Sequence, residues 1–321
     1  MRSSVRAAVL LVLLVAAALL ARVRPLPAQA IAVHDSASGV TLAVDDAFAL
    51  PVLRITLPGQ PAGDPGIVVI FPEHVTALPH GAGEPTHLYL FQPGARGQRP
   101  AWRVTGRSLE YEMELPGGVH LTARATLDAD GVRYGYRLVN RSGVPYDNIQ
   151  AVTDPRLLSP LLHDVRLART YVHHPAGFDL LASETPARLT MPLAEWLPNR
   201  YRVPFRWPVD AQRVARQPDG ITWYNKSRAV DEPFIATKSV AGGWVIATFS
   251  RDAGNVWTNP DLTCQHADPS APLAANGASV LLEEKTLIVR GTLDDALASI
   301  RRQRGTLQPK TLRETNRSLP K

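Results

Sequence analysis

Apolar and polar side chains alternate with a period of two through much of this 321-residue sequence, and this pattern constrains the fold most strongly. It is clearest in residues 109–115, 119–127 and 132–138, where one side of each segment is apolar and the other polar or charged. Such alternation is typical of half-buried β-strands. Turn sequences at 116–118 and 128–131 separate the segments. We therefore expect an antiparallel meander with one face on the core.

Further strand-like segments, interrupted by Gly and Pro, follow along the chain. They are residues 39–44, 52–57, 66–71, 87–91, 104–108, 149–153, 220–224, 234–238, 243–250, 279–282 and 285–290. This density of short strands predicts an all-β fold, a large antiparallel β-sandwich in a single domain over residues 31–303. One short C-terminal helix is expected after Thr292, an N-cap with Asp295 three residues later. Residues 304–321 are basic and lack periodicity, which predicts a flexible tail.

Composition and charge exclude several classes of protein. With a single cysteine, Cys264, the chain has no disulfide framework and no multi-cysteine zinc or iron–sulfur site. The net charge of +6 comes from both ends, because residues 31–300 carry more acidic than basic side chains. A nucleic-acid binder needs basic residues clustered on a folded face, so no nucleic-acid partner is expected. Nucleotide-binding, serine-hydrolase and zinc-protease motifs are missing from the sequence, and no cofactor is predicted.

The first 30 residues have the three parts of a secretory signal peptide. Arg2 and Arg6 precede an uninterrupted apolar run of 14 residues at 7–20, and an A-x-A cleavage pattern follows at 28–30. The run is shorter than the roughly 20 residues that a membrane-spanning helix needs. We therefore expect cleavage after Ala30 and a secreted or periplasmic protein with no stable membrane span. An uncleaved anchor is the alternative.

Several segments together resemble the galactose mutarotase-like β-supersandwich. They are LEYEMEL (109–115), GVHLTARAT (118–126), YRLVNRS (136–142), CQHADP (264–269) and GTLDDAL (291–297). The resemblance implies carbohydrate handling by an uncharacterised secreted bacterial protein, because this superfold hosts epimerases, lyases and hydrolase domains. In its aldose epimerases a His acts as general acid and a Glu as base. The motifs around those two residues are missing here, so the resemblance assigns neither role.

The densest polar cluster of the sequence lies at residues 257–268. An indole can stack on the apolar face of a sugar while Asn and Asp hydrogen-bond its hydroxyls. Its predicted substrate-binding residues are Trp257, Asn259 and Asp261, and its predicted catalytic residues are His266 and Asp268. Cys264 and His266 alone are too few ligands for a metal, and no metal site is predicted. The alternative is a structural loop with a buried Cys264.

A second cluster contains His173 and His174, with His163, Asp164 and Asp179 nearby in sequence. Neighbouring residues of a strand point to opposite faces, so at most one of the two adjacent histidines enters a given site. We take His174 as a candidate proton carrier and His173 as a candidate substrate-binding residue. Ordinary surface-loop chemistry is the alternative.

An aromatic-rich region with several arginines extends over residues 196–224. Aromatics and arginines together can line a groove for a polysaccharide, but they also pack a core in which arginine stems cover the rings. We predict packing for most of these residues and sugar contact for Trp207 and Trp223.

Two functions from different classes fit these patterns. The first is carbohydrate binding or processing, with acid–base chemistry on a sugar ring or glycosidic bond if the chain is an enzyme of epimerase, lyase or hydrolase type. The second is a non-catalytic structural or partner-binding module of the cell envelope. The two differ in whether His173 or His174 lies in one pocket with His266 and at least one carboxylate, within about 8 Å, as acid–base chemistry on one substrate requires. The sequence leaves the oligomeric state open.

Overall fold

Antiparallel β-strands dominate the computed structural model, which describes residues 31–47, 50–90, 100–209 and 213–308. The chain divides into two units, Met1–Ala30 and Ile31–Lys321, and all described residues belong to the second. The predicted signal peptide and residues 309–321 of the predicted tail lie outside the described residues. Within the described residues no helix is both long and apolar enough to cross a membrane.

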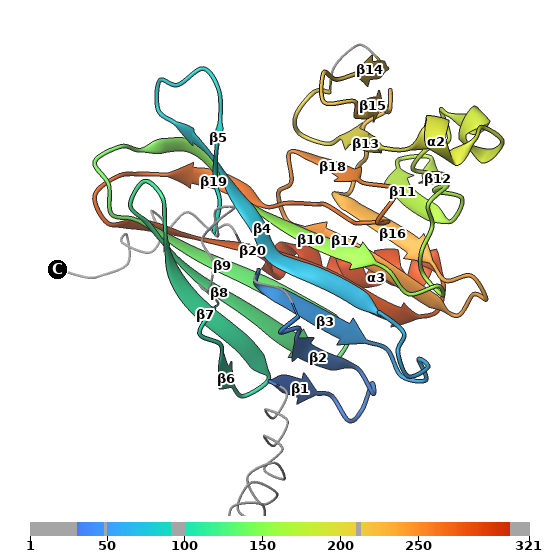
Figure 1. Ribbon diagram of the computed structural model, residues 1–321, viewed down its shortest axis with the longest axis horizontal. Helices are drawn as coiled ribbons and strands as arrows, with labels where there is room; N and C mark the ends of the chain where they lie inside the picture. The colour runs from blue at the N-terminus through green and yellow to red at the C-terminus, as the bar shows by residue number, and fades with distance from the viewer. Residues whose placement is uncertain (1–30, 48–49, 91–99, 210–212, 309–321) are drawn as a thin grey trace, which may run out of the picture. The chain divides into compact units, whose positions relative to one another are not determined.

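The first sheet has the strand order β1-β2-β3-β4-β10-β19, with β5 paired to β4, and its strand pairs are antiparallel (Figure 1). Its strands are β1 (Ala32–His34), β2 (Thr41–Val44), β3 (Val52–Thr56), β4 (Ile67–Pro79), β5 (Thr86–Leu88), β10 (Tyr146–Leu157) and β19 (Ser270–Leu273). The long strands β4 and β10 form its centre, where a change of register separates Val152, paired with His74, from Asp154, paired with Ile70.

The second sheet has the antiparallel order β12-β11-β16-β17-β20-β9-β8-β7-β6. Its strands are β6 (Arg103–Thr105), β7 (Ser108–Leu115), β8 (Val119–Asp128), β9 (Gly131–Asn140), β11 (Thr170–His174), β12 (Gly177–Leu180), β16 (Phe234–Lys238), β17 (Trp244–Ser250) and β20 (Ala278–Arg290). The predicted meander is β7-β8-β9 in this sheet, and the all-β prediction is confirmed.

A small third sheet has the order β14-β15-β13-β18, and of its strands only β15 overlaps a predicted segment, residues 220–224. Its strands are β13 (Asn199–Pro204), β14 (Val214–Arg216), β15 (Thr222–Asn225) and β18 (Asn255–Thr258). Strands β13 and β15 run parallel, which requires a crossover, and β14 lies within that crossover. Ahead of this sheet lie two short helical turns, η1 (Pro186–Leu189) and α2 (Leu193–Trp196).

The main core lies between the first and second sheets. Along β8 the alternate residues are buried, as the sequence pattern predicts, and they face buried residues of β3 and β4 in the same cluster. Tyr111 from β7 crosses this core and donates its hydroxyl to the carbonyl oxygen of Phe71 at 2.6 Å. Buried apolar area of this kind is the main stabilising contribution to the fold.

The predicted C-terminal helix is α3 (Leu293–Gln303), and it begins with the expected capping box between Thr292 and Asp295. Its apolar side packs on β16, β17 and β20, on the face of the second sheet that the first sheet does not cover. Ordered structure continues beyond the predicted boundary at residue 303. The turn η2 (Arg304–Thr306) follows the helix, and Leu307 is fully buried in the same cluster. The backbone N–H of Gln308 donates to the Glu283 carboxylate.

Candidate functional site

The segment 264–268 lies between the first and third sheets and brings the predicted His266 and Asp268 into the interior. On the β10 side, the backbone N–H of Gln265 donates to the Pro155 carbonyl oxygen. On the opposite side, His266 and Trp257 of β18 exchange backbone hydrogen bonds. Both neighbours hold this segment in an extended conformation, so its side chains alternate between opposite directions. His266 and Asp268 are less than 2% exposed.

His266 is the centre of a group of interacting side chains. Its ring stacks on the Trp257 indole with 3.6 Å between centroids and 3° between planes. Nε2 lies 3.1 Å from Cys264 Sγ and 3.7 Å from Asp154 Oδ1, and Nδ1 lies 3.6 Å from Asp268 Oδ1. Burial opposes a charged ring, but Cys264 and Asp268 outweigh it and raise the pKa of His266 well above its usual value.

Both carboxylates beside His266 are oriented by further side chains. Arg156 Nε donates to Asp154 Oδ2 at 2.6 Å, and Trp257 Nε1 donates to Asp268 Oδ2 at 3.1 Å. Asp268 also accepts the backbone N–H of Thr153 through Oδ1. Trp257 is thus both a stacking partner of the histidine and a hydrogen-bond partner of its carboxylate. We refer to His266, Asp268, Asp154, Cys264 and Trp257 as the His266 cluster.

Glu284 approaches the cluster from β20 of the second sheet. It is fully buried, and the Thr153 hydroxyl and the Ala267 backbone N–H are the hydrogen-bonding groups that act on its carboxylate. Burial, and then the neighbouring Asp268 carboxylate, raise the pKa of Glu284 well above its usual value. This combination favours a proton on Glu284 where an ordinary glutamate has lost it.

Glu73 and His74 of β4 are the partly exposed acid–base neighbours of the cluster. Burial, and then the charge of Asp154, raise the pKa of Glu73. Burial, and then the proximity of His87, lower the pKa of His74 to about 4. The irregular pairing between β4 and β10 occurs at these residues. A β-bulge of this kind redirects side chains and is frequent next to active sites.

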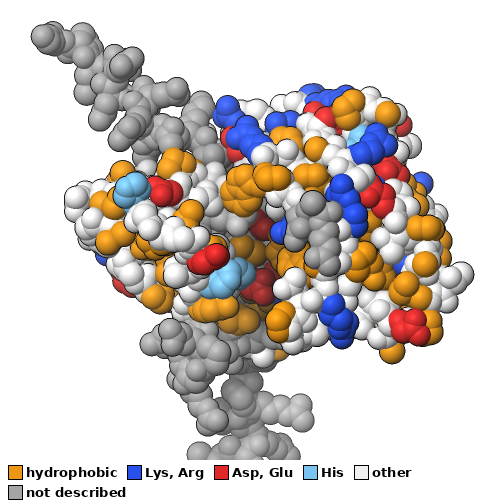
Figure 2. Space-filling view, turned by 90° about the horizontal axis from the view of Figure 1, so that it is seen from above, with side chains coloured by type: hydrophobic (Ala, Val, Ile, Leu, Met, Phe, Trp, Pro, Cys, Tyr) orange, Lys and Arg blue, Asp and Glu red, His pale blue; other side chains and the backbone are white. Residues whose placement is uncertain are grey.

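The rings of His87 and Tyr89 pack against His74. The ring centroids of His74 and His87 lie 4.6 Å apart, with the rings edge to face. The centroid of the Tyr89 ring, a residue that is 46% exposed, lies 5.8 Å from each of them. Figure 2 shows a hollow on the face that is seen from above, with acidic side chains at its depth and a histidine at its edge. The exposed Tyr89 ring and the fully buried His266 and Glu284 are thus connected by the partly exposed His74. Aromatic walls with a few polar groups are typical of small-ligand sites.

Asp154, Cys264 and His266 are the group of described residues that could hold a metal ion. Their donor atoms lie within 4.8 Å of one another and all three residues are buried. The third member, Asp154, comes from β10 and could not be found from the Cys264-x-His266 spacing alone. A thiolate, an imidazole and a carboxylate form a donor set that suits zinc.

Trp223, a predicted sugar-contacting residue, lies next to the cluster. Its ring centroid is 6.3 Å from that of Trp257, and the Arg202 guanidinium lies over its ring at 5.0 Å. Both tryptophans are half-buried. The predicted Asn259 and Asp261 lie in the loop that follows. The backbone N–H of Asn259 donates to Cys264 Sγ at 3.1 Å, and the backbone carbonyl oxygen of Asp261 accepts from His163 Nε2.

Trp207 belongs to a different surface. Its ring packs against Gly254, where an added Cβ would lie 2.0 Å from the indole, so only glycine fits there. It borders a shallow cavity of about 290 Å³ together with Arg206 and Asp252. Trp207 therefore does not contribute to the His266 cluster, and sugar contact by this residue stays a prediction.

His173 and His174 of β11 also lie in another group. His173 Nδ1 is 2.7 Å from Asp231 Oδ1, and His174 Nδ1 donates to the Ala229 carbonyl oxygen at 2.6 Å. Burial lowers the pKa of His174, and Lys226 acts in the same direction. The fully buried Lys226 is bonded to Asp179 in the same region. The structure therefore divides the predicted catalytic residues between two clusters.

Sequence reasoning missed four members of the site, namely Glu73, His74, Asp154 and Glu284. Two signals could have found three of them. Pro72 inside a strand pattern indicates a bulge, and Glu73 and His74 follow it directly. Glu283 and Glu284 are consecutive on a strand, so one of the two must face inward.

A scan against protein-family models and a search of curated proteins found no match for the sequence. A search of solved structures found similar chains. The Slr1438 protein from Synechocystis sp. PCC 6803 is 14% identical with a TM-score of 0.48, and the alignment covers 82% of this chain and 96% of that one.

Two Lactobacillus proteins are similar as well. A galactose mutarotase-like protein from Lactobacillus casei ATCC 334 is 10% identical with a TM-score of 0.45, covering 81% of this chain and 100% of that one. A galactose mutarotase related enzyme from Lactobacillus acidophilus is 11% identical with a TM-score of 0.43, covering 83% and 99%. Both are described as galactose mutarotase-like or related proteins, and the likeness to this chain is one of fold.

Proposed function

We propose that this chain is an exported carbohydrate-binding or carbohydrate-processing protein whose ligand site is the His266 cluster with Trp223, Glu73 and His74 at its edge. One observation carries the proposal. The half-buried Trp257 indole stacks on His266 and donates to Asp268, so a surface that can stack on a sugar is joined directly to ionisable groups. Concave sites with aromatic walls and a few convergent polar groups are typical of small-ligand binding.

Acid–base chemistry on the sugar is the catalytic form of this proposal. His266 with its Asp268 partner is the proton carrier, and the pKa values of Glu284 and His74 are displaced from their usual values in opposite directions. Pairs of titratable groups whose pKa values are driven apart are a common feature of acid–base sites. Glu73 and His74 are the partly exposed members, which supports a role for them in contacting the ligand ahead of the buried His266.

Export is supported by the sequence of residues 1–30 and by the position of the first strand. β1 begins at Ala32, so cleavage after Ala30 leaves every described strand intact. We expect the chain recovered from the exported fraction of an expressing bacterium to begin at Ile31, as measured by N-terminal sequencing. Recovery of the uncleaved chain with the membrane fraction would contradict this expectation and support an anchor.

Sugar binding is tested by titrating the protein with neutral mono- and oligosaccharides and following tryptophan fluorescence. Because Trp257 provides the stacking surface, Trp257→Phe should weaken binding at least about tenfold. Trp244→Phe is the matched control, since that ring lies under Arg290 at the far end of β17. Equal affinity in both variants would contradict the placement of the site.

Turnover separates the two forms of the proposal. Optical rotation and reducing-end assays on a bound sugar report ring or glycosidic chemistry, and His266→Asn should abolish it while leaving an affinity similar to that of the parent protein. Binding without turnover in the parent protein would support a non-catalytic binding module. Two observations favour this second form: His266 is fully buried, and His173 and His174 hydrogen-bond to Asp231 and Ala229 in another cluster.

A further inference from the structure

We propose that the outer face of the second sheet carries a separate binding site for a saccharide that bears an oxyanion, such as a uronate. The site is a pocket of about 440 Å³ over β7, β8, β9 and β20. This volume falls within the range of about 300–1,000 Å³ that is typical of small-molecule sites. It lies on the face opposite the core and opposite the His266 cluster, and it does not depend on the function proposed for that cluster.

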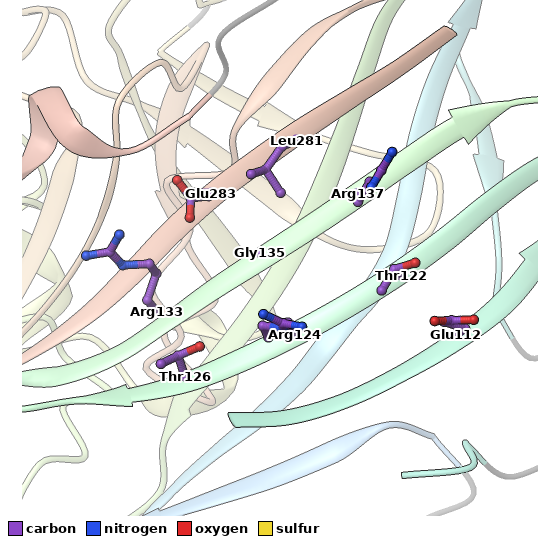
Figure 3. Close-up of a pocket in the computed structure, with 9 residues that line it drawn as sticks. All are labelled: Glu112, Thr122, Arg124, Thr126, Arg133, Gly135, Arg137, Leu281 and Glu283. Carbon is purple, nitrogen blue, oxygen red and sulfur yellow. The ribbon is translucent and has the colours of Figure 1, made fainter. Parts of the chain in front are cut away.

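Strand register creates the pocket around Gly135. On β9, Arg133, Gly135 and Arg137 point outward, and Gly135 lies between Arg124 of β8 and Glu283 of β20. Because Gly135 has no side chain, the backbone itself forms the floor at this point. Figure 3 shows the three arginines arranged around this bare stretch of β9, with Leu281 and Glu283 along its other border.

The charges of this face leave one guanidinium uncompensated. Arg124 is bound by Glu110, with Nε to Oε2 at 2.9 Å, and Glu112 is bound by Arg103. Arg133 lies 3.4 Å from Asp128. Arg137 is exposed and has no hydrogen bond or ion pair among the described residues. Its planar fork is therefore available for a bidentate contact with a carboxylate or phosphate.

The rest of the lining suits a hydroxylated ring. Thr122 and Thr126 offer hydroxyl groups, Glu112 and Glu283 offer acceptors, and Leu281, 36% exposed, offers an apolar surface. A simple anion would need only the arginine, whereas this mixture matches a sugar with one charged substituent. The Arg137 fork supplies the contact to the oxyanion, and the neighbouring acceptors bind the hydroxyls.

The test is isothermal titration calorimetry with D-glucuronate, D-glucose 6-phosphate, D-glucose and acetate at low ionic strength, where surface charges are least screened. It is done in the Trp257→Ala background, so that sugar binding at the His266 cluster does not contribute. Arg137→Gln removes the fork, and Gly135→Val fills the floor. An added Cβ at Gly135 meets its nearest atoms at 3.8 Å, an ordinary van der Waals contact, so a side chain can be attached at this position. Arg302→Gln, on the exposed side of α3, is the matched control.

We expect an acidic sugar to bind, glucose and acetate to bind at least about tenfold more weakly, and both pocket variants to lose at least about tenfold in affinity. Arg302→Gln should bind like the Trp257→Ala parent. The dissociation constants of glucuronate and glucose 6-phosphate then show whether the site prefers a carboxylate or a phosphate. Two results would overturn the proposal: no acidic sugar binds at millimolar concentration, or Arg137→Gln and Gly135→Val, shown to be folded by thermal melting, bind as tightly as the parent.

Discussion

Burial displaces the pKa values of individual residues around the His266 cluster in opposite directions, depending on which form is charged. Glu284 is favoured in its neutral, protonated form and His74 in its neutral, deprotonated form. Buried lysines elsewhere are compensated instead. Lys285 donates to Asp128, Asp130 and Gln303. Glu284 is fully buried and, unlike Lys285, forms no ion pair among the described residues.

His74 should make the protein less stable in mild acid. Its pKa is lowered from 6.5 to about 4, so between these pH values the unfolded chain binds a proton that the folded chain does not. Stability from this residue is fully present above pH 6.5 and is lost as pH falls toward 4, by at most about 3 kcal/mol. Urea unfolding of the parent and His74→Gln across pH 4–7 should show a smaller loss in the variant.

The control for this measurement is His34→Gln. His34 is exposed, and its Nδ1 lies 3.0 Å from the Thr41 hydroxyl. This variant should follow the parent at every pH. A loss of stability in His74→Gln equal to that of the parent between pH 6.5 and 4 would show that His74 is not the group responsible.

At the scale of the element, the α3 helix and the turn η2 act as one unit on the second sheet. Ile300 and Leu307 are fully buried in the same cluster, and Arg304 forms an ion pair with Glu232. The backbone N–H of Gln308 donates to the Glu283 carboxylate of β20. The end of the helix is thus not the end of the packed structure.

Two truncations test this unit. A chain ending at Gln303 loses the buried Leu307 and should be less stable by about 2–4 kcal/mol, the usual cost of removing a buried leucine. A chain ending at Gln308 keeps these contacts and should melt like the full chain. Thermal unfolding of both proteins measures the difference. Equal melting temperatures for the two truncations would show that Leu307 contributes nothing to the fold.

At the scale of the molecule, period-two patterns predicted the strands that carry their own signal, such as those of the meander. The β7-β8-β9 meander and the α3 cap could be read locally for this reason. The short strands β1, β11, β12, β13, β14, β18 and β19 were not predicted. The site could be read only in part. His266, Asp268 and Trp257 are close in sequence, but Asp154 and Glu284 reach them from β10 and β20. No local pattern encodes such long-range pairing.

Glu283 and Glu284 are consecutive residues of β20, yet one borders the outer pocket and the other faces the His266 cluster. The two proposed sites therefore lie on opposite faces of one sheet and use adjacent residues of the same strand. Inserting or deleting one residue within β20 upstream of Glu283 would turn each glutamate toward the opposite side. The buried apolar side chains of the shifted part of β20 would change faces with them, so this strand tolerates substitutions far better than changes in length.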